Sequence, residues 1–446
     1  SPATASVDEN TILAWLGEAQ SSVETVSAGE VSRGDDAMMA ILRECVTWAA
    51  RHAGTPQSDT MRARVLEVYG SLRPDSPHRH LLLLMLGHAR GPRDLAELVE
   101  CLVLDPPLDR GTAVLPLAPL LSVPPDDPAL VFPRLLAGLG HPQIAAGILD
   151  LANHWTRHGI VDSHPARNRV SDLIKLLDGV TSHLESMIAS ASLAKPSVQT
   201  QCAQSISLAI SLCDALAQIG IDRARPALER IASLPHRRLR VEAEAALARL
   251  GDPDAPARLV ALAAEPSVRL FVLAYAEELG VLERVPESLQ EPVARAEADL
   301  AMWLAQPHQM GFPPSSIELI HQCTLQWPGY DEPRMCFLLR YTYATAHAAG
   351  DEPAESTSLS NVGIAGPITR AFHADLANLP PKDLYAVFAG SDASHQEIQD
   401  QWLDLKGDCA AEVRPQALEP LVRQLRQFGC VEIRPRILTD FLEPKC

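Results

Sequence analysis

The 446-residue sequence predicts an all-α fold, an α-α superhelix (a solenoid) followed by a mainly helical C-terminal region. One helical segment occurs twice, at residues 239–251 and, 29 residues later, at 268–280. A shorter helix is expected before each copy, and most of the 36 prolines fall between expected helices, where a helical solenoid tolerates them. Because a helix pair of about 30 residues cannot bury its apolar stripe alone, it must stack on neighbouring pairs.

The two copies begin and end with the same types of residue, and their apolar residues have the same spacing. Each begins with an apolar residue followed by an arginine, Arg240 or Arg269, and continues with small or apolar residues at helical spacing. Each ends with leucine followed by glycine, Gly251 or Gly280, at the position where a left-handed helix cap favours glycine. The preceding helices are expected at 225–232 and 255–262, each with a proline in its first turn.

This pattern resembles the HEAT-like repeat of the short bacterial type, which is also found in phycobilin lyases. The resemblance is specific over about residues 222–280. It implies an α-solenoid whose concave face holds a protein partner, and it implies that Arg240 and Arg269 link neighbouring repeats. Since a few proteins with such repeats are enzymes, a HEAT-type lyase or isomerase resembling the phycobilin lyases is the alternative function.

The rest of the chain is divided into three parts around these repeats. Residues 1–36 are expected to form one helix and a loop that could cap the solenoid, because residues 12–16 make a short amphipathic centre. Residues 37–305 are expected to form the HEAT-like solenoid. Its further helices are predicted at 37–53, 60–72, 81–89, 94–104, 112–121, 129–138, 143–158, 167–194, 198–219 and 292–305.

Residues 306–446 lack the repeat and are predicted to be mainly helical. Residues 351–360 are polar and acidic, as in a linker, and 361–367 are interpreted as a loop entering a helix, because they lack the spacing of a phosphate loop. A single short strand is expected at 430–433. The predicted helices lie at 315–326, 334–349, 367–378, 381–389, 396–405 and 415–428.

Composition limits the function classes. A formal net charge of −18 argues against sequence-independent binding to nucleic acid or to an anionic membrane, so a protein is the expected partner. The nine cysteines show no zinc spacing and are expected to be reduced. No apolar run approaches 18 residues and no secretion signal precedes the first helix, so no membrane insertion and a cytoplasmic location are expected. The dominance of alanine and leucine and the excess of arginine over lysine are typical of a GC-rich genome and predict a bacterial source.

One row of polar residues has the spacing of a metal site. Asp150, His154 and His158 lie four apart on one expected helix, and Asp162 or His164 could complete a zinc or iron site. A solvated flank of the helix is the favoured interpretation, because spacing alone provides no supporting shell. The pairs His373/Asp375 and His395/Glu397 are similarly interpreted as local turns and caps. The sequence therefore predicts no metal, cofactor or catalytic residue.

The predicted function is that of a non-catalytic scaffold or adaptor that binds a protein partner through the concave face of the solenoid. The second helix of each pair should line that face. The residues expected to contact the partner are Asp150, His154, Glu242, Arg249, Glu277 and Glu278.

Overall fold

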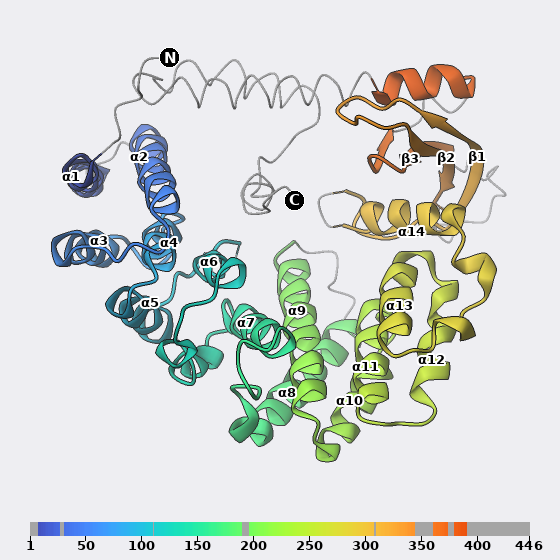
Figure 1. Ribbon diagram of the computed structural model, residues 1–446, viewed down its shortest axis with the longest axis horizontal. Coiled ribbons are helices and arrows are strands. Elements are labelled where there is room, and N and C mark those ends of the chain that lie inside the picture. Colours follow the sequence, from blue (N-terminus) through green and yellow to red (C-terminus); the bar gives the residue numbers. More distant parts are fainter. Residues whose placement is uncertain are drawn as a thin grey trace. The chain divides into compact units, whose positions relative to one another are not determined.

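The protein is mainly helical and carries one small antiparallel sheet (Figure 1). This computed structural model describes residues 8–26, 31–109, 111–189, 196–306, 309–343, 360–372 and 379–389. These residues belong to two compact units, the first extending to Ala227 and the second beginning at Leu228. The division does not coincide with the boundary expected near residue 306, because the sheet belongs to the same unit as the repeated helix pairs.

The first unit is built from helices that pack on their neighbours in the chain. Helix α1 lies on α2 and α3, α4 packs on α2, α3 and α5, and α9 packs on both α7 and α8. The helices are α1 (Glu9–Val26), α2 (Val31–Arg51), α3 (Asp59–Ser71), α4 (Arg79–Ala89), α5 (Pro92–Leu104), α6 (Ala118–Ser122), α7 (Ala145–Arg157), α8 (Val170–Ala189) and α9 (Pro196–Ile219).

Two predicted helices of the first unit are replaced by shorter turns. The segment 112–121 consists of the 3-10 turn η1 (Leu115–Leu117) and the short α6, and 129–138 is covered by η2 (Pro128–Leu130) and η3 (Arg134–Gly140). Prolines 116, 119, 128 and 133 lie in or beside these segments. Each proline removes a backbone donor, which limits the length of a regular helix.

The second unit contains the repeated pairs where the sequence predicts them. They are α10 (Arg225–Ala232, which spans the division), α11 (Arg237–Arg249), α12 (Ala255–Ala261), α13 (Pro266–Glu278) and then α14 (Pro292–Leu304). Gly251 and Gly280 have φ of 77° and 67°, which confirms the predicted left-handed caps. In both copies the amide after the glycine bonds back into the last turn, Asp252 N–H to the Leu247 carbonyl and Val281 N–H to the Ala276 carbonyl.

The C-terminal part of the second unit corrects the sequence prediction. Where helices were predicted at 315–326, 334–349 and 367–378, four antiparallel strands are described, paired in chain order. They are β1 (Ser316–Leu325), β2 (Arg334–Thr342), β3 (Ser360–Ala365) and β4 (Arg370–Phe372). The loop expected at 361–367 is largely β3, so the prediction of a mainly helical C-terminal region is wrong for these residues.

Two features of β1 and β2 explain why the sequence predicted helices in place of these strands. The partly buried residues Ile317, Ile320 and Cys323 of β1 recur every three residues and imitate a helical stripe. They belong to two faces, since Ile317 packs on the α14 side and the other two on the side of residues 381–389, with a bulge between Leu319 and His321. Strand β2 is apolar along residues 335–339 because both of its faces are covered. A short apolar run of that kind does not distinguish a buried strand from a buried helix.

Helices cover both faces of the sheet. Helix α14 packs on one face through Leu300 and Leu304, against Phe337 and Leu339 of β2. The other face is covered by a helix at residues 381–389, as predicted, with Leu384, Tyr385 and Phe388 facing the sheet. Gly363 allows the close approach of α14, because a Cβ there would lie 2.7 Å from Leu300 Cδ1.

Several predicted features lie outside the described residues. They are most of the linker at 351–360, the helices at 396–405 and 415–428, the strand at 430–433, and the pairs His373/Asp375 and His395/Glu397.

Replacing Leu247 with aspartate should unfold the helix pairs of the second unit. Leu247 lies on α11 and is 1% exposed, so the substitution buries an unpaired carboxylate at a cost of several kcal/mol, comparable with the ~5–15 kcal/mol stability of a whole domain. Circular dichroism and thermal melting measure the loss. The control is Ala274→Asp at an exposed position of α13, which should melt like the wild type. Equal melting of both variants would contradict the helix register described above.

Candidate functional site

Three of the six residues expected to bind a partner, Glu242, Arg249 and Glu278, lie where α11 packs beside α13. Arg249 at the end of α11 donates from Nε and Nη2 to the two carboxylate oxygens of Glu278, both at 2.8 Å. Since the two residues are 29 apart, they occupy the same position in successive copies of the repeat. This bidentate geometry is among the strongest for an arginine and a carboxylate.

Aromatic side chains extend this contact along the two helices. The Tyr275 hydroxyl donates to Glu242 Oε2 at 2.6 Å, and Glu242 also pairs with Arg238 one turn earlier on α11. The guanidinium of Arg238 lies 3.1 Å from the centre of the Phe271 ring, and that of Arg249 lies 5.0 Å from the centre of the Tyr275 ring. We call the set Arg238, Glu242, Arg249, Phe271, Tyr275 and Glu278 the α11–α13 ridge.

The members of the ridge differ in exposure. Glu242 is only 3% exposed, so it is a buried cross-link between α11 and α13, and the prediction that it faces outward is wrong. The Glu278 side chain is 51% exposed and Glu277 beside it is exposed as well, as expected. Phe271 and Tyr275 are partly buried. The ridge therefore presents carboxylates above an aromatic and guanidinium layer.

The electrostatics of the inner layer follow from its burial. Burial lowers the pKa of Arg238, although Glu242 opposes the effect. Burial and the adjacent Glu242 carboxylate raise the pKa of Tyr275. The raised pKa keeps Tyr275 protonated, as the donor of its hydrogen bond to Glu242 Oε2.

The basic cluster near the start of α11 is largely neutralised. Besides the pairing of Arg238, Arg237 Nε lies 2.6 Å from Glu265 Oε2. Arg240 is exposed and makes no ion pair with any described residue, so its expected role in linking repeats is wrong. Arg269, at the equivalent position of the second copy, does link elements: it donates to the carbonyls of Ala263 and Ala294 at 2.9 and 2.7 Å.

Asp150 and His154 lie on α7 in the first unit. The Ser211 hydroxyl of α9 donates to Asp150 Oδ1 at 2.6 Å, and desolvation raises the pKa of this carboxyl. The rings of His154 and His158 stack with centres 4.1 Å apart, and desolvation together with the neighbouring His158 and Arg157 lowers the pKa of His154. Asp150 thus fastens α7 to α9.

The possible metal ligands near α7 do not converge. Nδ1 of His158 lies 2.9 Å from the carbonyl oxygen of His154, and Asp162 is exposed. His164 is buried and faces Asn153. Over the described part of the chain, no three His, Cys, Asp or Glu side chains are grouped so as to hold a metal ion.

His164 belongs to a buried hydrogen-bond chain that sequence analysis missed. The Ala166 amide donates to His164 Nδ1 at 3.1 Å, so Nε2 carries the proton and donates to Asn153 Oδ1 at 3.0 Å. Asn153 Nδ2 in turn donates to the Ser211 carbonyl at 3.0 Å. A second proton on His164 would displace the Ala166 amide, and burial lowers the pKa of His164 to about 4. No spacing in the sequence indicates this chain, because it depends on the fold of residues 158–166 back onto α7 and on the packing of α7 against α9.

Helix α9 is also apolar enough over Gln201–Ile219 to meet the length and hydropathy requirements of a membrane span. No apolar run of that length was expected from the sequence. Within the first unit this stretch packs on α7 and α8, and Asp214 on it forms an ion pair of 2.5 Å with Arg157. These contacts are typical of a core helix.

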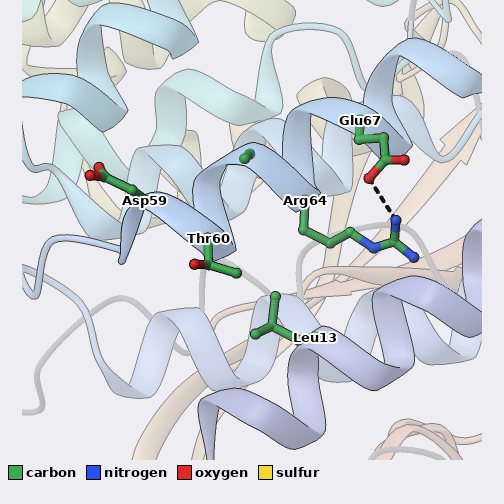
Figure 2. A pocket seen from close by; sticks show the side chains of 6 residues that line it. Leu13, Asp59, Thr60, Arg64 and Glu67 are labelled. Atoms are coloured by element: carbon green, nitrogen blue, oxygen red, sulfur yellow. Dashed lines mark hydrogen bonds and ion pairs between the residues drawn. The ribbon is translucent and has the colours of Figure 1, made fainter.

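A shallow, open hollow lies between α1 and α3 (Figure 2). Leu13 forms one wall, and Asp59, Thr60, Arg64 and Glu67 lie along the other. Arg64 pairs with Glu67 at 2.6 Å, and Asp59 pairs with Arg93 at 2.9 Å, so the charged groups satisfy one another.

Comparison with known proteins gives no relative. No family model, no curated protein and no solved structure matches the chain.

The buried His164 should make the protein less stable in acid. The unfolded histidine binds a proton below pH 6.5, whereas the folded one stays neutral down to about pH 4. The contribution of His164 to the free energy of unfolding is therefore complete above pH 6.5. It is lost as the pH falls towards 4, at about 1.4 kcal/mol per pH unit. Urea denaturation at a series of pH values measures this loss.

The matched variants are His164→Asn, which keeps an acceptor for the Ala166 amide but does not titrate, and His183→Asn at an exposed position of α8. The first should have a shallower pH dependence than the wild type, and the second should follow the wild type. An unchanged profile in His164→Asn would show that His164 is not the responsible group.

Proposed function

We propose that the protein is a non-catalytic, cytoplasmic scaffold or adaptor, in which stacked HEAT-like helix pairs bind a protein partner. The observation that carries the proposal is the α11–α13 ridge. Three of the residues expected to contact a partner, Glu242, Arg249 and Glu278, belong to this one cluster although they come from two repeats.

The ridge has the residue types that contribute most to protein–protein affinity. Arginine and tyrosine are enriched among residues that dominate binding energies, and here both occur beside partly buried Phe271. Arg249 is held by Glu278 and by the Tyr275 ring, so little side-chain entropy would be lost when a partner covers it.

The charge of the outer layer defines the partner. Glu278 of the ridge and the adjacent Glu277 are exposed, and the whole chain has a net charge of −18. A basic protein segment with arginine and aromatic side chains complements this surface and would be attracted to it over a distance. The alternative of a lyase or isomerase gains no support from the hollow between α1 and α3, where the charged groups are paired and open to solvent.

Charge reversal at the ridge should abolish capture of the partner. The variant Glu277→Lys/Glu278→Lys removes the outer carboxylates and releases Arg249, and we expect at least a tenfold loss of binding, or about 1.4 kcal/mol. Affinity capture from a native lysate with quantitative mass spectrometry measures the retained proteins. Glu283→Lys/Glu287→Lys changes the same net charge at exposed positions outside the ridge and should retain the partner. Equal retention by both variants counts against the ridge as the binding site.

Nucleic acid should bind negligibly. Arg237 and Arg238 are already paired with Glu265 and Glu242, so few cationic groups are available to neutralise phosphates. Titration of labelled duplex DNA and single-stranded RNA at low and physiological salt should give no micromolar binding. Affinity with a steep salt dependence, lost in Arg237→Gln/Arg240→Gln, would refute the scaffold proposal and indicate phosphate recognition.

A further inference from the structure

The hairpin of β1 and β2 places two cysteines directly opposite each other. In the antiparallel register Cys323 of β1 is the partner of Cys336 of β2. Side chains of directly opposed residues lie on the same face of a sheet, with Cβ atoms about 4.5–5.5 Å apart. A disulfide requires Cβ atoms about 3.5–4.5 Å apart, so a small closure of the hairpin would join the two sulfurs.

The two thiols differ in burial, so they have different roles in a reaction with a reagent in solution. Both face residues 381–389, where the Tyr385 hydroxyl donates to the carbonyls of His321 and Cys336 at 3.2 and 3.3 Å. Cys336 is completely buried, and burial raises its pKa to about 11. Cys323 is only partly buried and lies on β1, the edge strand of the described sheet. A reagent in solution therefore meets Cys323 first.

We propose that Cys323 and Cys336 form a thiol–disulfide site that is oxidised by low-molecular-weight disulfides. The Cys323 thiolate attacks one sulfur of oxidised glutathione, its disulfide breaks, and one glutathione thiolate leaves and takes up a proton. Cys336 then gives up its proton and attacks the Cys323 sulfur, the Cys323–glutathione bond breaks, and the second glutathione leaves as a thiolate that takes up a proton. The two protein thiols become one disulfide, and one oxidised glutathione becomes two reduced molecules.

The Cys323–Cys336 disulfide would join β1 to β2 on the face of the sheet that the helix at residues 381–389 covers. Of the other cysteines in the described ranges, Cys45 lies on α2, Cys101 on α5, and Cys202 and Cys213 lie 11 residues apart on α9. All four are on helices of the first unit, so within the described ranges the cross-strand pair is Cys323 and Cys336. The proposal thus depends on the β1–β2 register and is independent of partner binding at the α11–α13 ridge.

Peptide mapping tests the site directly. The reduced, folded protein is incubated with oxidised glutathione, free thiols are alkylated, and trypsin is added without reductant. Cleavage after Arg295, Arg334 and Arg340 separates the two cysteines into peptides 296–334 and 335–340. We expect these peptides to be joined and two hydrogens lighter than their sum. Because the folded hairpin holds the thiols together, joining should need at least about tenfold less oxidised glutathione than in urea.

Two variants and one internal control complete the experiment. In Cys336→Ser, Cys323 should retain one glutathione, and in Cys323→Ser, Cys336 should stay unreacted. Cys202, which is partly buried on α9, should acquire at most a glutathione adduct. If the folded wild type keeps glutathione on Cys323 with a free Cys336, or forms the link only in urea, the proposal is wrong.

Discussion

The second unit depends on the buried guanidinium of Arg269. This side chain is 4% exposed and lies where α13, the turn before it and α14 meet. Its Nε and Nη1 donate to the carbonyls of Ala263 and Ala294, and Nη1 is also 3.2 Å from Glu297 Oε2. A buried cation destabilises the fold unless its hydrogen-bond donors have acceptors. Two of the acceptors, the Ala294 carbonyl and Glu297, lie on α14, so α13 depends on α14.

Helix α14 transmits that constraint to the sheet. One side of the helix packs on α13, and Leu300 and Leu304 cover one face of β2. The contact is close enough that Gly363 is needed opposite Leu300. The repeated pairs and the sheet therefore share a core helix, which explains why they belong to one compact unit.

The candidate site lies on the same helix as Arg269. Phe271, Tyr275 and Glu278 of α13 contact residues of α11, whereas Arg269 connects α13 to α14. The helix that carries the ridge is thus fixed by its neighbours on both sides in the chain. A rigid support of this kind favours a preformed binding surface over one assembled when the partner arrives.

Much of the helical fold could be predicted from sequence, and much of the site could not. The limits of α10, α11, α13 and α14 lie within two residues of the prediction, since glycine and proline act locally. The sequence also singled out Arg249 and Glu278, but as separate groove residues; their bidentate pairing requires α11 to lie beside α13. Glu242 was expected to face outward because it lies on the second helix of its pair, yet it is buried and pairs with Tyr275 and Arg238.

The sequence by itself determined the repeated helix pairs and their caps, because helical spacing and the left-handed glycines at 251 and 280 are properties of short segments. The tertiary structure decided that residues 316–325 and 334–342 form strands, which of the carboxylates are buried, and that Cys323 lies opposite Cys336. The physical reason is that strand pairing, a bulge and the burial of a charge are fixed by partners distant in the chain, and local residue patterns do not specify those partners.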